Sequence, residues 1–270
     1  MAPRKGNQLV TRNERNRLRQ AYRSQAHEVA AHNVETLKYI DMLEAKARLT
    51  KSDVWDELSS YRQSHTSGVT GYLIKDALRV FLGDMQGNRC CYCRRWLINI
   101  AHAKPIEHIL SRTDYPQFSI EFFNLAIACF DCNQLKSDTK WGSIRTSAIN
   151  YPASEKFIDF YHPRIHRYID HVRYERIERD DFCSVTYTSH TTQGRHLCDK
   201  ILYIVAAREN LYSNIPSMAQ AINSIKEHQE TTGTEEPTAM SKFLTLLNES
   251  IDMHLDRNAA DGKPLTSKSK

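Results

Sequence analysis

The pattern of apolar and polar positions predicts a chain that begins with helices. Residues 8–48 hold long-chain helix formers and contain neither Gly nor Pro, which favours a long helix. N-cap residues introduce a second predicted helix over residues 53–63. Apolar residues at helical spacing predict a third helix over residues 72–83 that ends at Gly83. We therefore expect residues 1–83 to form a helical arm and platform.

The middle of the chain, residues 84–142, has a different pattern. It holds two pairs of cysteines and the short β-like runs KPIEHIL and FNLAIAC. We expect residues 84–142 to be a separate unit that contains two strands.

Residues 143–257 mix strand and helix patterns. The runs VRYERIE and CSVTYTS predict a pair of strands, after which Gly194 predicts a break. Three helices are predicted beyond it, over residues 195–212, 217–230 and 239–256. The polar end, residues 258–270, is expected to be disordered. The predicted fold class is α+β and predominantly helical.

Composition and charge narrow the class of protein. No apolar run approaches the roughly 20 residues of a membrane helix, and the basic N-terminus lacks the apolar stretch of a secretory signal, so we expect a cytoplasmic protein without membrane contact. The net charge of +5 is weak support for a polyanionic partner. Residues 4–23 hold seven basic side chains against one acid, Glu14. They form either a solvated helix face or an arm that contacts nucleic acid.

The cysteines favour a metal site. An odd count of seven in a cytoplasmic chain argues against a disulfide framework. Cys90 and Cys93 form one C-x-x-C pair, and Cys129 and Cys132 form a second. Two such pairs supply the four thiolates of a tetrahedral Zn²⁺ site, while Cys91 is expected to take no part. The alternative is a set of buried free thiols or a redox pair. A closed four-cysteine site is structural, so any reaction needs other residues.

Polar groups between and after the pairs are candidates for chemistry. Glu107 and His108 are adjacent on a predicted strand, Asn124 begins the next strand, and Asn133 follows the last cysteine. A carboxylate beside a histidine can supply a hard metal ligand and a general base. Taken singly, each has an ordinary alternative, because a lone histidine is more often a core or surface residue and asparagine often caps helices or turns.

The order of these groups resembles the HNH nuclease motif, the ββα-metal fold. C-x-x-C, Glu-His, Asn-Leu and then C-x-x-C-Asn-x-x-Lys follow one another over about residues 89–139, with the strands IEHIL and NLAIAC and a helix beginning near FDCNQLKSD. The resemblance implies that His108 is the general base that activates water and that Asn124 orients it. It also implies that Glu107 and Asn133 bind a catalytic cation.

Further consequences of the resemblance concern the metal and the substrate. Two residues differ from the commoner HNH pattern. Glu107 occupies the position of an Asp, and Asn133 occupies the position of the final His. The resulting oxygen ligands suit Mg²⁺ or Mn²⁺. Lys136 is implied to contact phosphate, and Arg112 is a further predicted contact to nucleic acid. Adjacent strand residues face opposite ways, so Glu107 and His108 can share a site only if the strand bends.

A wider resemblance leads to expectations about partners. The segment from IEHILSR to CNQLKSD, and more loosely the chain to about residue 212, is similar to the nuclease subunit of Septu-type and retron anti-phage defence systems. This implies a DNA endonuclease that works beside an ATPase subunit, and any oligomer is expected to form through that complex. A non-catalytic zinc module and an HNH-type RNase acting on RNA or tRNA remain the alternatives. The arm could bind the ATPase or nucleic acid.

The histidines of YHPRIHRYIDH were a further candidate for a metal site. Their spacing in a stretch rich in tyrosine and arginine favours instead residues at the surface that face phosphate. This group comprises His162, His166 and His171.

Overall fold

The computed structural model describes residues 9–62, 68–98, 104–137, 140–180 and 182–214, together with residues 217, 220 and 224. Its helices are α1 Arg12–Arg23, α2 Asn33–Thr50, α3 Trp55–Ser60, α4 Gly71–Met85, α5 Phe130–Lys136, α6 Tyr168–His171, α7 Thr192–Leu197 and α8 Tyr203–Asn214. Its strands are β1 Ile106–His108, β2 Leu125–Ile127, β3 Val172–Arg179 and β4 Phe182–Ser189. The tail 258–270 and nearly all of the helices predicted over 217–230 and 239–256 lie outside the described residues.

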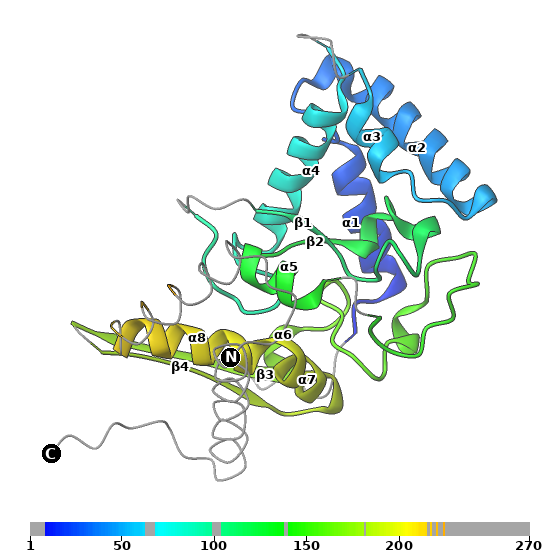
Figure 1. The fold of residues 1–270 in the computed structure, drawn as a ribbon. Helices are drawn as coiled ribbons and strands as arrows, with labels where there is room; N and C mark the ends of the chain where they lie inside the picture. The colour runs from blue at the N-terminus through cyan, green and yellow to red at the C-terminus, as the bar shows by residue number, and fades with distance from the viewer. Residues whose placement is uncertain are drawn as a thin grey trace, which may run out of the picture.

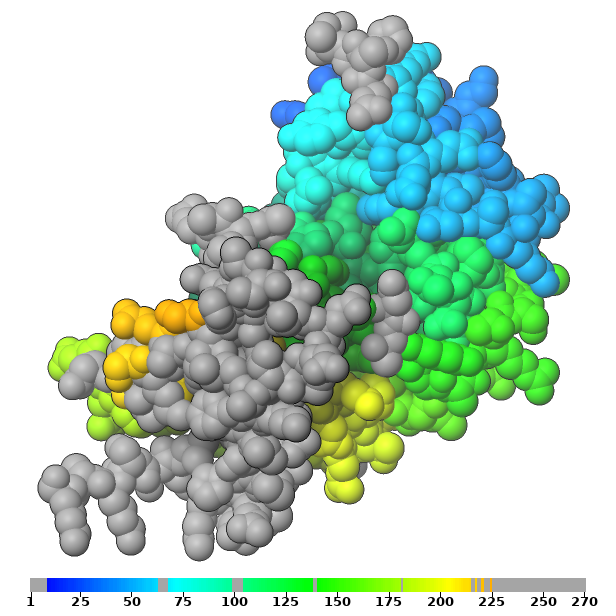
Figure 2. Space-filling model, viewed as in Figure 1, coloured from blue at the N-terminus to red at the C-terminus, as the bar shows by residue number. Residues whose placement is uncertain are grey.

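The elements are arranged in three groups (Figure 1). Helices α1 to α4 form one group, and β1, β2 and α5 lie between them and the β3–β4 hairpin with α7 and α8. Figure 2 shows the blue and cyan helical group directly against the green middle segment. Helices with two small two-stranded sheets confirm the predicted α+β class. The middle group of β1, β2 and α5 can therefore contact both the N-terminal helices and the β3–β4 hairpin group.

The predicted long helix over residues 8–48 is wrong, because the chain breaks after Arg23 and resumes as α2. Asn33 holds the break, since its side chain accepts from the Ala26 amide at 2.8 Å and donates to the Arg23 carbonyl at 2.9 Å. Side-chain bonds of this kind offer the backbone an alternative to the helix. The break brings the end of α1 close enough to α2 for Arg23 to pair with Asp41.

Helix α1 is docked on the rest of the chain. The Val10 amide donates to the Ile165 carbonyl at 3.0 Å, and Arg19 pairs with Glu121. Arg15 donates to the Pro152 carbonyl at 3.4 Å. Two of the seven basic side chains counted in residues 4–23, Arg15 and Arg19, are therefore used in contacts with distant parts of the chain.

Two glycines differ from their predicted roles. Helix α4 continues through Gly83 to Met85, and the chain turns at Gly87, whose φ of 61° is one that glycine adopts without strain. Gly194 lies inside the first turn of α7 and does not break the chain before it. A Cβ at Gly194 would lie 2.0 Å from the carbonyl oxygen of His171, so the close approach requires glycine.

The two short strands of the middle segment form an antiparallel pair. Ile106 lies opposite Ile127, and His108 lies opposite Leu125. Every residue of β2 is buried, and α4 packs against this strand. A continuous apolar run of this kind is typical of a strand buried on both faces. Helix α5 begins three residues after β2 ends.

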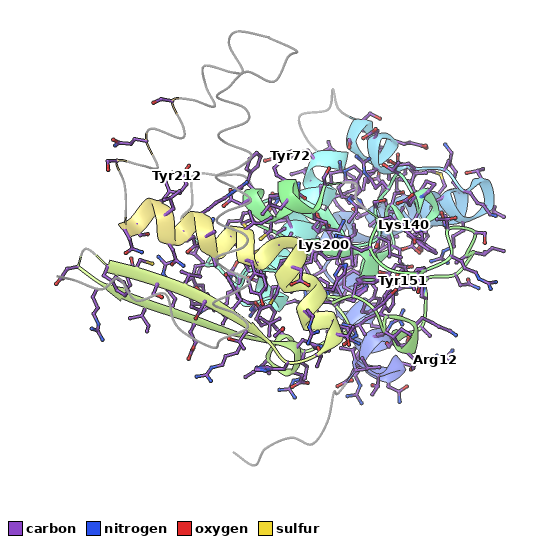
Figure 3. The ribbon with its side chains drawn as sticks, turned by 60° about the horizontal axis from the view of Figure 1, so that its bottom comes forward. Arg12, Tyr72, Lys140, Tyr151, Lys200 and Tyr212 are labelled. Carbon is purple, nitrogen blue, oxygen red and sulfur yellow. The ribbon has the colours of Figure 1, made fainter. Side chains whose placement is uncertain are left out.

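The predicted strand pair of the last region is confirmed as β3 and β4. The two strands run antiparallel from Val172 opposite Ser189 to Arg179 opposite Phe182. β4 alternates buried and partly buried residues, and α8 lies along it (Figure 3). The amide side chains of Asn210 and Asn214 bond to the backbone of β4 and fix α8 on the hairpin.

Candidate functional site

The four cysteines of the two C-x-x-C pairs meet in one buried cluster. The Sγ atoms of Cys90, Cys93, Cys129 and Cys132 all lie within 4.8 Å of one another. The Sγ atoms of Cys93 and Cys129 are 3.8 Å apart. Sulfurs held at about 2.3 Å from one tetrahedral Zn²⁺ are about 3.8 Å apart, so this donor set fits such an ion. Cys91 is buried and lies outside the cluster.

Local structure explains how the sequence forms each pair. The first pair turns back tightly, since the Cys90 amide donates to the Arg95 carbonyl at 2.9 Å and Arg94 has a φ of 63°. In the second pair Cys129 is the N-cap of α5, and its Sγ accepts from the Cys132 amide at 3.5 Å. A helix N-terminus favours negative charge, which suits thiolates.

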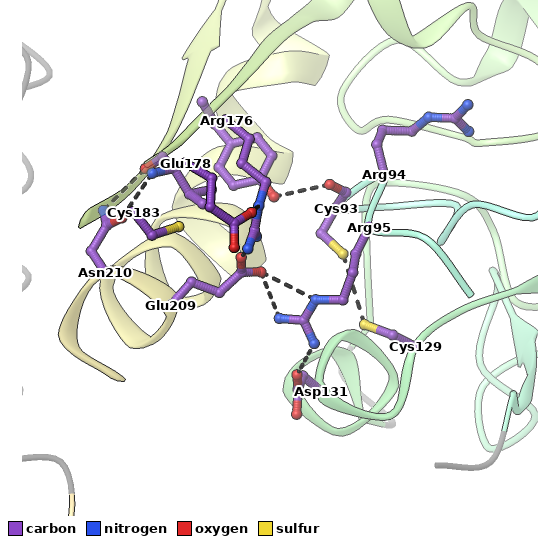
Figure 4. A network of polar contacts seen from close by, with 12 residues as sticks. Cys93, Arg94, Arg95, Cys129, Asp131, Arg176, Glu178, Cys183, Glu209 and Asn210 are labelled. Atoms are coloured by element: carbon purple, nitrogen blue, oxygen red, sulfur yellow. Dashed lines mark hydrogen bonds and ion pairs between the residues drawn. The ribbon is translucent and has the colours of Figure 1, made fainter. Parts of the chain in front are cut away.

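The cysteine cluster is tied to the β3–β4 hairpin and α8 (Figure 4). Arg95 pairs with Asp131 of α5 at 2.6 Å and with Glu209 of α8 at 2.6 Å. Tyr187 of β4 donates its hydroxyl to the Cys93 carbonyl at 2.9 Å. A metal that orders the first cysteine pair would therefore also order the contacts that hold the hairpin.

A polar cleft of about 300 Å³ opens beside β1 and α5. It gathers most of the predicted catalytic and nucleic-acid residues from three segments of the chain. Its lining residues are Trp55, Pro105, Ile106, Glu107, His108, Ser111, Arg112, Asn133, Gln134, Lys136 and Ser137. Glu107 and His108 share this cleft although they are adjacent on a strand, and His108 is the last residue of β1.

Glu107 is the buried acid of the cleft. Its Oε1 atom receives Lys136 Nζ at 2.8 Å and the hydroxyl of Tyr92 at 3.2 Å. Burial raises the pKa of Glu107, against the opposing effect of the Lys136 ammonium. Lys136 also donates to the His108 carbonyl at 2.9 Å and is 2% exposed. The ammonium predicted to contact phosphate is thus paired with the carboxylate.

His108 has a defined tautomer. Its Nε2 atom lies 2.8 Å from the carbonyl oxygen of Ser119. A carbonyl only accepts hydrogen bonds, so Nε2 carries the proton and Nδ1 is the unprotonated nitrogen of the neutral ring. Burial, followed by the charge of Arg112, lowers the pKa of His108 to about 3. A neutral imidazole at neutral pH is the form that a general base requires.

Asn124 lies outside the cleft and makes no hydrogen bond to the imidazole of His108. Its side chain accepts from the Leu110 amide at 2.7 Å and donates to the carbonyls of Leu110 and Phe118, each at 3.0 Å. These bonds fix the loop that joins β1 to β2, and Ser119 is the next residue of that loop. Any effect of Asn124 on His108 is therefore transmitted through the loop backbone.

The other two predicted site residues lie at the cleft surface. Asn133 is partly buried and lines the cleft from the first half of α5. Arg112 pairs through Nη1 with Asp53 at 2.9 Å and with Asp56 at 3.6 Å. Within the part of the chain that the structure describes, both ion pairs end on the same nitrogen, so they leave the other N–H donors of the guanidinium fork without a partner there.

The histidines of YHPRIHRYIDH are buried, so the prediction that they face solvent and phosphate is wrong. His162, His166 and His171 are at most 5% exposed. Tyr151 explains the position of His162, because its hydroxyl lies 2.7 Å from His162 Nε2 and donates to Asn124 Oδ1 at 3.3 Å. The stretch is a polar core that supports the loop between β1 and β2. Among the described residues, the four cysteines are the only group of three or more His, Cys, Asp or Glu side chains close enough to hold one metal ion.

Three residues around the cleft were not anticipated from the sequence. Tyr92 reaches Glu107 from inside the first C-x-x-C pair, Ser119 holds His108, and Trp55 packs against the His108 ring. Tyr92 had a local signal, since it lies between two metal ligands. Trp55 and Ser119 had no local sequence signal, because their contacts depend on how distant segments of the chain pack.

The cleft offers two oxygen donors of the kind that a hard divalent cation takes. Across the described ranges, both contacts of the Glu107 carboxylate end on Oε1, which leaves Oε2 as a further donor, and Asn133 adds an amide oxygen on the same cleft. Oxygen donors of this kind suit Mg²⁺ or Mn²⁺.

Comparisons with protein-family models, with curated proteins and with solved structures each found no match for this chain. Among the described residues, no helix has both the length and the apolar character needed to cross a membrane.

Proposed function

We propose that the chain is a metal-dependent HNH-type endonuclease that hydrolyses phosphodiester bonds of DNA. The observation that carries this proposal is the order strand, strand, helix beside a four-cysteine cluster, with Glu107, His108 and Asn133 on one cleft. A zinc module that only binds a partner has no need of a buried carboxylate and a neutral histidine in a separate polar cleft.

His108 acts as the general base. Its Nε2–H is held by the Ser119 carbonyl, so Nδ1 accepts a proton from the water that attacks phosphorus. The low pKa of His108 keeps the ring neutral, so Nδ1 carries no proton before the water is activated. Arg112 contacts a phosphate oxygen of the substrate from the edge of the cleft.

Metals have two separate roles in this proposal. Cys90, Cys93, Cys129 and Cys132 would hold a structural Zn²⁺. Glu107 and Asn133 would hold Mg²⁺ or Mn²⁺, which when bound supplies Lewis-acid stabilisation of charge on the phosphate and the leaving oxygen.

The similarity to the nuclease subunits of Septu-type and retron systems supports an anti-phage role beside an ATPase subunit. In that setting the ATPase restrains or triggers cleavage. RNA or tRNA is the other substrate class, because the chemistry at phosphorus does not distinguish it from DNA.

Replacing Glu107 by alanine tests the proposal. Plasmid DNA and tRNA are incubated with Mg²⁺ or Mn²⁺ and with the native or Glu107→Ala chain, alone and co-expressed with the proposed ATPase partner. We expect cleavage of DNA by the native chain only, with the same zinc content in both chains. Equal cleavage by both would contradict the assigned cleft, and cleavage of tRNA alone would move the substrate to RNA.

A further inference from the structure

One wall of the cleft comes from the N-terminal helical group, outside the segment that resembles HNH nucleases. Trp55 is the first residue of α3 and lines the cleft together with His108. The two rings meet at a centroid distance of 4.6 Å and an interplanar angle of 89°. Edge-to-face packing of this kind is a favourable, directional contact that restrains both rings.

The tryptophan ring has a second contact. Lys75 of α4 places its ammonium 4.1 Å from the centroid of the Trp55 ring, and its Nζ also bonds to Ser59 of α3. A cation over an indole face is attracted by the ring quadrupole. The indole therefore contacts both α4 and the imidazole, which favours a supporting role over that of a free platform for a nucleobase.

The residue before Trp55 reaches the same imidazole by a second route. The Val54 amide donates to Ser119 Oγ at 3.1 Å, and both residues are buried. The Ser119 carbonyl in turn accepts from His108 Nε2 at 2.8 Å. Val54 thus anchors the residue that fixes the tautomer of His108, while Trp55 restrains the ring itself.

We infer that Val54 and Trp55 position the imidazole of His108, and that this makes the docked N-terminal helices part of the catalytic unit. The inference rests on the proposed function, because it concerns the same base. Trp55 acts through His108 and is a positioning residue.

The expected effect is on the rate of the chemical step. Misplacing a catalytic group by about 1 Å can lower a rate by about 100-fold. We expect Trp55→Ala to lower the single-turnover cleavage rate by about 10- to 100-fold at saturating chain, with an unchanged half-saturating concentration. Trp55→Phe keeps an aromatic edge and should recover most of the rate. Trp96→Ala is the matched control, since Trp96 stacks on Arg89 and does not line the cleft.

A double-mutant cycle separates positioning from other roles. Single-turnover cleavage is measured for the native chain, Trp55→Ala, His108→Ala and the double variant, with the ATPase present if cleavage requires it. If Trp55 acts only through His108, replacing Trp55 should not lower the cleavage rate further in a chain that already lacks His108. We expect the double variant to match His108→Ala. A further loss in the double variant, or an unchanged rate in Trp55→Ala, would overturn the inference while leaving His108 as the base. No loss in His108→Ala would overturn the proposed function itself.

Nuclear magnetic resonance provides a readout that does not depend on cleavage. The chain is labelled with ¹⁵N-histidine, and the Nε2–H signal of His108 is assigned by its absence in His108→Ala. We expect a protected signal at fixed neutral pH in the native chain and Trp96→Ala, and a fast-exchanging or absent signal in Trp55→Ala. A signal equally protected in Trp55→Ala would contradict the positioning role.

Discussion

Replacing Lys136 by methionine would remove the buried charge that balances Glu107. The two side chains are 2% and 5% exposed, and Nζ lies 2.8 Å from Oε1. The same ammonium donates to the His108 carbonyl, so one side chain links α5 to both predicted catalytic residues of β1. Methionine keeps most of the apolar length and deletes the charge.

The magnitude follows from this geometry. Unit charges 2.8 Å apart attract by about 6 kcal/mol at an effective dielectric constant of about 20, and desolvation of both groups offsets much of that attraction. Removing only the ammonium leaves a buried unpaired carboxylate, so we expect Lys136→Met to lower the free energy of unfolding by about 3–5 kcal/mol at pH 8. The loss should shrink as the pH falls, because the pKa of Glu107 is already raised and protonation removes its charge.

Urea denaturation of four chains measures this coupling. The native chain, Lys136→Met, Glu107→Gln and the double variant are compared at pH 8 and pH 5 with zinc present. The double variant should be more stable than the sum of the single effects predicts, by at least about 2 kcal/mol. Additive effects that do not change with pH would refute the reasoning, since they would mean that the two groups do not interact in the folded chain.

Three further predictions concern separate parts of the molecule. Metal analysis should find about one zinc per chain in the native protein and none in Cys129→Ser, because the cluster needs all four thiolates. Asn124→Ala should lower the free energy of unfolding by about 3 kcal/mol in urea denaturation, since it deletes three buried hydrogen bonds worth about 1 kcal/mol each. Burial and the charge of Glu121 raise the pKa of Glu44 to about 7, so Glu44→Gln should stabilise the fold by up to about 3 kcal/mol at pH 8 and by little at pH 4.

The sign of the Glu44 effect follows from proton binding. Between about pH 4.5 and pH 7 the folded chain holds a proton on Glu44 that the unfolded chain has lost, so stability falls as the pH rises through this window. A native chain at least as stable as Glu44→Gln at pH 8 would contradict this account. Zinc retained by Cys129→Ser would contradict the four-cysteine metal site. An Asn124→Ala chain as stable as the native chain would contradict the role of Asn124 in anchoring the loop.

The features that the sequence predicted correctly are those encoded locally. The spacing of Cys129 and Cys132 around a helix start brings both thiols to one end of α5 without help from distant segments. The apolar run before Cys129 similarly predicted β2, because a buried strand is recognisable from a few residues. Glu107 and His108 were singled out by their place in this local order, and both line the cleft; their catalytic roles stay a prediction.

The features that the sequence did not reveal depend on tertiary packing. Asn33 breaks the first predicted helix only because its side chain reaches back to Arg23 and Ala26. The Lys136 side chain is oriented toward Glu107, and this orientation depends on the burial of both groups in the folded chain. Trp55 lies some 50 residues from His108 in the chain, so no periodicity could have placed it in the cleft.

Cleavage by a chain without the proposed base tests the central claim most directly. Plasmid DNA is incubated with Mg²⁺ or Mn²⁺ and with the native chain, His108→Ala or the matched control His190→Ala, whose side chain is exposed at the end of β4. We predict that the native chain and His190→Ala cleave at the same rate and that His108→Ala is slower by about 10²- to 10⁴-fold, the usual contribution of a general base. Equal cleavage by all three chains would contradict the assignment of this cleft as the catalytic site.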